Sequence, residues 1–229
     1  MMMKNKLLYL LFLLLMVTSC SHTADTPLLG TLELSIAVEQ PVSSTVSTRA
    51  VDAELQVEVW SVDGATMLHK FTPGQSPNRM TLEAGSYLLK AFTPNYQTTY
   101  GNDELGEAKY YAEKVFSIEP AVVNRISCPV PMVNTAISLS LPEGFNTWFT
   151  SYSFSIKQST TSRTVSIEVG QTAYFDCTDG ATSLLYTLTS INTDDEPNSD
   201  SNTLSASAGT HYRITYAWET KCLLAKKEE

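Results

Sequence analysis

Apolar and polar residues alternate in short segments along most of the chain after residue 30, which is the two-residue period of a β-strand with one buried face. Turn residues such as Asp63-Gly64 separate these segments, and no stretch has a convincing helical period. The pattern therefore predicts an all-β protein built from short strands. The alternating side chains of its first segment, 31–39, are Leu32, Leu34, Ile36 and Val38.

The first half of this pattern predicts one β-sandwich, because seven or eight short strands without a helix form a domain of about 100 residues. A Ser/Thr-rich loop at residues 40–50 and a long loop at residues 93–109 interrupt the strands. The expected strands cover residues 31–39, 53–62, 66–71, 79–82, 86–92, 110–118 and 121–128.

The second half repeats the pattern after a junction at residues 129–133, where two prolines break any strand ladder. The fold class is therefore all-β, with two tandem Greek-key β-sandwiches at residues 31–131 and 132–229. A weak internal repeat supports this: residues 81–87 and 204–212 both join a short strand to a Tyr-bearing strand through an Ala-Gly turn. The second set of strands covers residues 135–141, 152–157, 163–169, 172–177, 182–191, 204–207, 210–218 and 220–225, with a short helical turn in 142–149 and an acidic loop at 192–202.

Residues 1–20 have the pattern of a bacterial lipoprotein signal. Lys4 and Lys6 precede an apolar run, residues 7–17, that is shorter than the 20 or so residues of a membrane span. The run ends in Val-Thr-Ser-Cys, the order of a lipobox: an apolar residue, two small residues and a cysteine. We expect residues 1–19 to be a cleaved signal peptide, Cys20 to carry the lipid, and residues 20–30 to form a tether. The alternative is an ordinary signal with an incidental cysteine.

The charge of the chain excludes one class of partner. The formal net charge is −9, and removing residues 1–19 with their two lysines makes it −11. Nucleic-acid binding needs clustered Lys and Arg, so we expect no nucleic-acid partner. The same charge argues against electrostatic adhesion to anionic lipid, and leaves the acyl chains on Cys20 as the membrane contact.

The cysteines and histidines give no sign of a metal site or of catalysis. Cys128, Cys177 and Cys222 are far apart and lack zinc-ligand spacing, so buried free thiols and a Cys177–Cys222 bridge both stay open. The histidines, His22, His69 and His211, have no nucleophile or metalloprotease motif beside them. We therefore expect no catalytic residue, no metal, no cofactor and no enzyme activity.

A resemblance to a known family rests on several short motifs in a fixed order. They are the lipobox, 30–36 (GTLELSI), 47–50 (STRA), 82–87 (LEAGSY), 110–116 (YYAEKVF), and Cys128 followed by 132–134 (MVN). Together they resemble the uncharacterised, DUF-type lipoproteins of gut Bacteroidales, over nearly the whole mature chain. Those proteins are in turn similar in layout to fimbrillins, the pilus and adhesion subunits of the same bacteria.

The resemblance to fimbrillins implies two tandem transthyretin-like sandwiches and a specific maturation step. In that group an Arg-specific protease cuts an early loop, the first strand leaves, and a strand from the next subunit fills the groove. Arg49 and Ala50 match the position of such a cut. An unpaired edge also favours strand addition on physical grounds. The alternative is a plain surface arginine in a loop.

Two further segments carry candidate binding residues. Tyr96, Tyr100 and Tyr110, in and beside the loop at residues 93–109, either contact a sugar or protein ligand or pack back on the sheet. The aromatic residues Trp148, Phe149 and Tyr152 offer the same choice between stacking on a ligand and core packing. The acids of the loop at 192–202 lack the spacing of an EF-hand and indicate a solvated hairpin tip: Asp194, Asp195, Glu196 and Asp200.

The sequence thus predicts a lipid-anchored protein of the outer membrane that acts as a non-catalytic interaction or adhesion module, with fimbrillin-like pilus or accessory roles included. The alternatives are a glycan-binding lipoprotein of a nutrient-uptake system and a structural envelope protein without a ligand. Only one acid follows Cys20 within residues 21–25, so both faces of the membrane stay open, with the cell surface favoured.

Overall fold

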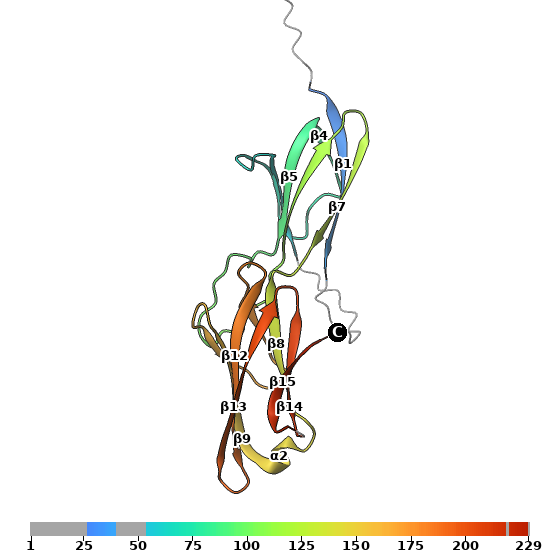
Figure 1. Ribbon diagram of the computed structural model, residues 1–229. Helices are drawn as coiled ribbons and strands as arrows, with labels where there is room; N and C mark the ends of the chain where they lie inside the picture. The colour runs from blue at the N-terminus through green and yellow to red at the C-terminus, as the bar shows by residue number, and fades with distance from the viewer. Residues whose placement is uncertain (1–26, 40–53, 219, 229) are drawn as a thin grey trace, which may run out of the picture.

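The computed structural model describes residues 27–39, 54–218 and 220–228, and nearly all of its regular structure is β-strand. Four sheets form two β-sandwiches, which lie end to end in an elongated molecule (Figure 1). The predicted all-β architecture of tandem sandwiches is confirmed. None of the helices in the described ranges is long and apolar enough to cross a membrane.

The N-terminal sandwich packs a sheet of order β4-β1-β7 against a sheet of order β3-β2-β5-β6. Its core includes Leu32, Val59, Leu89 and Val130, each fully buried. Alternation brings these side chains inward from both sheets, as the sequence pattern predicts. The strands are β1 (Leu29–Val38), β2 (Gln56–Ser61), β3 (Met67–Phe71), β4 (Arg79–Glu83), β5 (Gly85–Phe92), β6 (Tyr111–Ile118) and β7 (Val123–Val130).

The C-terminal sandwich packs a sheet of order β11-β8-β14-β15 against a sheet of order β10-β9-β12-β13. Its core includes Ile156, Phe175, Ile214 and Leu223, each fully buried. One short helix, α2 (Phe145–Trp148), confirms the helical turn predicted in residues 142–149. The strands are β8 (Asn134–Ser140), β9 (Phe149–Gln158), β10 (Thr164–Ser166), β11 (Thr172–Asp176), β12 (Ala181–Asn192), β13 (Pro197–Ser207), β14 (His211–Ala217) and β15 (Cys222–Lys227).

The two sandwiches share one topology. In each, the first strand lies inside a sheet, antiparallel to the fourth strand and parallel to the seventh: β1 between β4 and β7, and β8 between β11 and β14. The facing sheets also correspond strand by strand, and β15 is an additional eighth strand. The sheets fall on either side of residues 131–133, and the boundary between residues 131 and 132 stays a prediction.

The internal repeat predicted from the sequence aligns the wrong strands. Residues 81–87 cover the end of β4 and the start of β5, whose topological equivalents are β11 and β12. Residues 204–212 instead cover the end of β13 and the start of β14. An Ala-Gly turn between two strands is common enough to occur at non-equivalent places, because glycine supplies the positive φ that many turns need.

The acidic segment at residues 192–202 contains less loop than predicted. β13 begins at Pro197 and pairs with β12 along its whole length, from Pro197 opposite Ile191 to Ser207 opposite Ala181. β13 is an edge strand with mostly exposed side chains, so the alternating apolar signal is weak. Backbone pairing to β12 needs no particular side chain, which explains how a polar segment continues the sheet.

The three cysteines of the described residues are all free. Cys128 is buried in the N-terminal core, and burial raises the pKa of its thiol. Burial also raises the pKa of the Cys177 thiol to about 11. Of the two alternatives left open by the sequence, the structure has free thiols rather than a Cys177–Cys222 bridge.

Residues 93–109, the long predicted loop, run from β5 to β6 and contact both sandwiches. We call this segment the strap. It leaves β5 and runs against the C-terminal sandwich, where Asp103 N–H donates to Thr164 O at 2.9 Å and Tyr174 N–H donates to Leu105 O at 2.7 Å. Leu105 packs against the C-terminal core, and Tyr174 packs against the N-terminal core. The strap thus contributes Leu105 to the C-terminal core, and β11 contributes Tyr174 to the N-terminal core.

Arg163 binds the strap from the side of the C-terminal sandwich. Its side chain donates to Gly101 O at 2.9 Å, to Tyr174 O at 2.7 Å and to Glu104 O. The guanidinium also lies over the rings of Tyr100 and Phe175, with its Cζ atom 5.8 and 4.8 Å from the ring centres. Only 8% of Arg163 is exposed, and this burial lowers the pKa of the guanidinium below its ordinary value. The residue thus satisfies three backbone acceptors at the junction.

Lys109, the last residue of the strap, forms hydrogen bonds at the same junction. Its Nζ donates to Thr98 O at 2.6 Å and to Asp176 Oδ1 at 2.7 Å. Buried Asn134 adds a two-way contact, since its Oδ1 accepts from Lys109 N–H at 3.0 Å and its Nδ2 donates to Glu107 O at 2.8 Å. These bonds link the strap to the first residue of β8.

We predict that Arg163→Ala destabilises the protein by about 2–4 kcal/mol, because it leaves three partly buried carbonyl oxygens without their donor. Chemical denaturation followed by circular dichroism measures this change. Limited proteolysis should also show faster cleavage within residues 93–109, since the variant loses the contacts that hold the strap.

The matched control is Arg125→Ala. Arg125 is an arginine with a different environment: it pairs with Glu33 at 3.1 Å, and its side chain is 77% exposed. An exposed pair of this kind contributes about 0–1 kcal/mol. Equal losses of stability in the two variants would contradict the role assigned to Arg163.

Candidate functional site

Strand β1 is the candidate site that the sequence prediction singles out, because the expected maturation step acts on it. It lies inside its sheet with a partner on each side. Leu29–Glu33 pair with β4 in antiparallel register, and Thr31–Val38 pair with β7 in parallel register. One strand therefore connects two others that have no pairing with each other in the described sheets.

The side chains of β1 fix its register. Leu32 is fully buried and Leu34 is 8% exposed, and both belong to the N-terminal core. Gly30 lies against the turn after β6: a Cβ atom at this position would be 2.2 Å from Glu119 O and 2.6 Å from Ile118 Cγ2. Only glycine fits such a close approach, so the small residue at one end and two leucines further along define how a strand enters this place.

Main-chain hydrogen bonds beyond the regular ladder also hold β1. Thr31 N–H donates to Val122 O at 3.0 Å, Leu34 N–H to Asn78 O at 2.9 Å, and Glu39 N–H to Val130 O at 3.0 Å. Such bonds depend little on side-chain identity, so another strand with similar residues could make them. We call the space that β1 occupies between β4 and β7 the β1 slot.

Three predicted site residues cannot be placed. Cys20, Arg49 and Ala50 lie outside the described residues. The described chain ends its first stretch at Glu39 and resumes at Glu54, so the segment with Arg49 follows directly after β1 and precedes Leu55 of the core.

The predicted ligand-contacting tyrosines pack against the protein itself. Tyr110 is 2% exposed in the N-terminal core. Tyr96 stacks on Tyr111 with 4.4 Å between ring centres, and Tyr100 lies beneath Lys109 and Arg163. Burial raises the pKa values of the Tyr100 and Tyr110 hydroxyls. These three tyrosines therefore pack against other side chains of the protein, which is one of the two alternatives that the sequence left open. The strap that carries Tyr96 and Tyr100 lies at the junction between the sandwiches.

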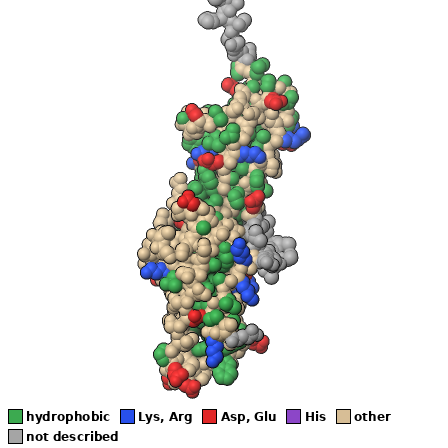
Figure 2. Space-filling view, in the orientation of Figure 1, with side chains coloured by type: hydrophobic (Ala, Val, Ile, Leu, Met, Phe, Trp, Pro, Cys, Tyr) green, Lys and Arg blue, Asp and Glu red, His purple; other side chains and the backbone are tan. Residues whose placement is uncertain are grey.

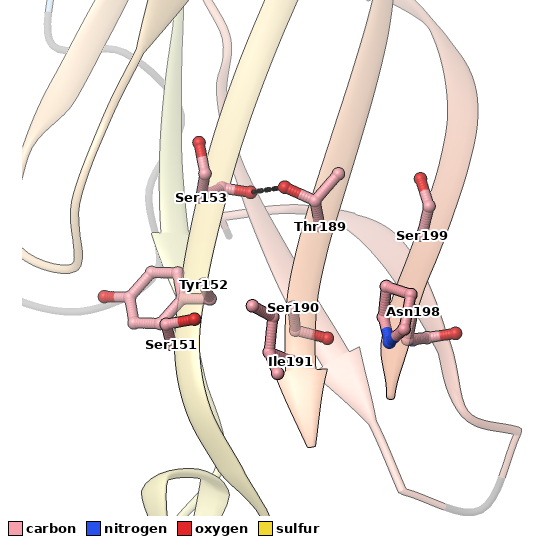
Figure 3. Close-up of a pocket in the computed structure, with 9 residues that line it drawn as sticks. Ser151, Tyr152, Ser153, Thr189, Ser190, Ile191, Asn198 and Ser199 are labelled. Carbon is pink, nitrogen blue, oxygen red and sulfur yellow. Dashed lines mark hydrogen bonds between the residues drawn. The ribbon is translucent and has the colours of Figure 1, made fainter. Parts of the chain in front are cut away.

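Hydroxyl groups cover the outward face of β9, β12 and β13 towards the end of the C-terminal sandwich (Figure 3). Thr189 pairs with Ser153 of β9 on one side and with Ser199 of β13 on the other. The Thr189 hydroxyl donates to Ser153 O at 3.4 Å. The residues around this hollow of about 580 Å³ include no carboxylate, imidazole or thiol, so it offers hydrogen bonds without an acid or a base.

The structure brings together a serine, a histidine and a carboxylate that the sequence does not place near one another. His211 Nε2 is 3.0 Å from Ser138 Oγ, and His211 Nδ1 is 2.6 Å from Glu228 Oε2. Desolvation, with a further contribution from the positive charge of Arg213, lowers the pKa of His211, whereas Glu228 acts in the opposite direction. Only the register of β8 beside β14 reveals this contact, because 73 residues separate Ser138 and His211.

This trio lacks the surroundings of a hydrolase triad. A serine nucleophile needs free N–H donors nearby for the oxyanion. Ser138 instead lies on an inner strand, paired with Thr172 of β11 and Arg213 of β14, so the neighbouring backbone groups belong to sheet ladders. Arg213 also pairs with Glu228. The arrangement ties the chain after β15 to β14, and no group of three His, Cys, Asp or Glu in the described ranges could hold a metal ion.

The acidic and aromatic candidates lie at the far end of the C-terminal sandwich. Asp194, Asp195 and Glu196 form the exposed tip between β12 and β13, as predicted. Asp200 lies instead within β13, where its Oδ2 accepts from Leu223 N–H of β15. Trp148 is 63% exposed, whereas Phe149 and Tyr152 are only partly exposed.

Several solved structures are similar to this chain at low identity. A candidate adhesin from Bacteroides ovatus is 13% identical, with 90% of this chain and 97% of that chain covered and a TM-score of 0.45. A candidate cell adhesion protein from Bacteroides uniformis is 10% identical, with 89% and 96% covered and a TM-score of 0.48. The fimbrial anchor protein Mfa2 from Porphyromonas gingivalis is 12% identical, with 85% and 95% covered and a TM-score of 0.38.

No curated protein matches the sequence. Residues 29–226 match a family described as a domain of unknown function, DUF4493. The match begins at the first residue of β1 and ends within β15, so it includes both sandwiches. The expected membership in an uncharacterised, DUF-type family is confirmed. The chain belongs to the DUF4493 family.

Proposed function

We propose that this protein is a lipid-anchored interaction module of the outer membrane, displayed on the cell surface, that engages a protein partner by exchange of strand β1. The proposal has two parts, which are attachment through Cys20 and strand addition in the β1 slot. The position of β1 between β4 and β7 is the observation that carries it.

Removal of β1 would leave a slot with two unpaired strand edges and an apolar floor. β4 would lose five paired residues and β7 would lose eight. The places of Leu32 and Leu34 in the core would also open to water. Unpaired edges and exposed apolar surface both favour a replacement strand, which can restore the same hydrogen bonds and bury the same area.

A cut after Arg49 would make β1 replaceable. In the intact chain, β1 is tethered to β2 by the segment from residue 39 to residue 54, so a second strand competes with an intramolecular one at high effective concentration. The cut removes that advantage. Complementary roles follow for the incoming strand: glycine at the position of Gly30 and aliphatic residues at the positions of Leu32 and Leu34.

Anchoring and strand exchange follow one another, because Cys20 and β1 lie on the same side of Arg49. The lipid holds the uncut protein, and after a cut and the departure of β1 the sandwiches are attached through the incoming strand. Each buried methylene contributes about 0.8 kcal/mol, and stable attachment needs two or more acyl chains. A triacylated Cys20 meets this requirement without any further membrane-binding surface. The short tether places the N-terminal sandwich next to the membrane and the C-terminal sandwich beyond it.

Protease shaving of intact cells tests the surface location. We expect external protease to remove the C-terminal sandwich while a periplasmic marker protein stays intact. A Cys20→Ser variant should instead appear in the soluble fraction, because it cannot be acylated. Full retention of the protein in shaved cells would contradict display on the surface.

Strand exchange can be measured with a labelled peptide of residues 29–38. We expect the peptide to bind after an Arg-specific protease has cut the protein at Arg49, and at least about tenfold more weakly when the protein is uncut. A peptide with Gly30→Val should fail to bind, since a side chain there meets Glu119 O.

Arg49→Ala is the matched protein control, because it removes the cleavage site and leaves β1 unchanged. It should resist the protease at this position and exclude the peptide. Equal peptide binding by the cut protein and the Arg49→Ala protein would refute exchange at the β1 slot.

A further inference from the structure

A second candidate site lies at the end of the molecule opposite to β1. In Figure 1, α2 and the turn between β12 and β13 form the lower tip, whereas β1 lies in the upper sandwich. Figure 2 shows acidic and hydrophobic side chains exposed side by side at this lower tip. If Cys20 anchors the protein, this tip is the part that extends furthest from the membrane.

The tip contains a hollow of about 580 Å³, a size typical of small-ligand sites. Two of the chain's three tryptophans line it: Trp148 at the end of α2, 63% exposed, and Trp218 after β14, 37% exposed. Tryptophan side chains are highly buried on average in folded proteins. Two partly exposed indole rings beside one hollow leave an apolar surface that a ligand can cover.

An aromatic cluster supports one of the two rings, Trp218, from inside. Trp218 stacks on Phe149 with ring centres 6.2 Å apart and planes at 11°, and meets Tyr216 edge to face at 5.4 Å. Phe145, which is 2% exposed, contacts Phe149 at 4.5 Å. This packing holds Trp218 and Phe149 in place before any ligand arrives, which limits the entropy lost on binding at that part of the wall.

The opposite wall is polar and is fixed by hydrogen bonds. Asn192 Oδ1 accepts from the N–H groups of Asp194 and Glu196 at 3.0 and 2.8 Å, and its Nδ2 donates to Glu196 Oε2 at 3.0 Å. Thr193 N–H donates to Trp148 O at 3.1 Å, which ties this turn to α2. Carboxylate and amide groups of the turn therefore face the hollow beside the tryptophans.

From this arrangement we propose that the hollow binds an uncharged carbohydrate. The C–H face of a sugar ring stacks on Trp148, and the hydroxyl groups of the sugar donate to the carboxylates of Asp194 and Glu196 and bond to the amide of Asn198. An apolar wall beside convergent polar groups fits a molecule with the same two characters.

Charge selects this ligand class over two others. The hollow is lined by two carboxylates and one cation, Lys221, and the turn adds Asp195. This excess of negative charge repels sialylated or sulfated glycans and anionic membrane surfaces. A purely apolar protein segment would bury the carboxylates without partners, at a cost in free energy.

The site deepens the proposed surface function and rests on it for its biological setting, but its chemistry does not depend on strand exchange. Carbohydrate binding by the tip requires neither a cut at Arg49 nor an empty β1 slot. Failure of one proposal is therefore distinguishable from failure of the other.

The test uses the purified, uncut full-length protein on an array of neutral oligosaccharides with matched sialylated and sulfated forms, followed by calorimetric titration of the bound compounds. We expect binding of neutral oligosaccharides and weaker binding of the anionic forms. Trp148→Ala should weaken the affinity at least about tenfold, Trp148→Phe should weaken it less, and Asn198→Ala should also weaken it.

Trp60→Ala is the control, because Trp60 is the remaining tryptophan and lies on β2 of the other sandwich. It should leave the affinity unchanged. Circular dichroism should show Trp148→Ala to be folded, since the side chain is mostly exposed. The proposal is overturned if no neutral oligosaccharide binds, if Trp148→Ala binds as well as the original protein, or if Trp148 is instead needed for binding to phosphatidylglycerol vesicles.

Discussion

Both sandwiches depend on the parallel pairing of their first strand with a strand far along the chain. β1 pairs with β7, and β8 pairs with β14. Because each partner is the seventh strand of its sandwich, neither sheet can form fully until most of that sandwich has folded. This pairing also makes the first strand the connection between two others. In the N-terminal sandwich, the facing sheet β3-β2-β5-β6 does not contain β1, so its strands stay paired when β1 is exchanged.

The junction between the sandwiches is built from charged side chains in an unusual place. Arg163 and Lys109 are 8% and 4% exposed, yet each binds backbone carbonyls of the strap. Charged groups are rarely this buried unless their donors are all used. The cost of burial is offset because the strap, as an irregular segment, has carbonyl groups that no sheet satisfies. The polar junction therefore fixes the orientation of one sandwich on the other.

This rigid, elongated arrangement separates two proposed contacts along one axis. The β1 slot is at the end that carries the predicted anchor, and the tryptophan-lined hollow is at the other end (Figure 1). A strand partner at one end and a carbohydrate at the other can thus be bound without competing for space. The hydroxyl-covered face of β9, β12 and β13 lies beside the tryptophan-lined hollow, with which it shares Pro197 and Asn198, and adds hydrogen-bonding surface without an acid or a base.

The sequence by itself determined the features that depend on neighbouring residues. Alternation of apolar side chains, as in Leu32 and Leu34, specifies a strand with one buried face, and the lipobox at Cys20 is likewise a local pattern. The local pattern missed the first half of β13, because an edge strand with exposed side chains pairs through its backbone alone. Only the tertiary structure decided that Tyr100 lies under Arg163, that Ser138 meets His211, and that Trp148 and Trp218 line one hollow. Each of these contacts joins residues brought together by sheet register and by the packing of one sandwich on another, and such long-range pairings leave no periodic signal in a single chain.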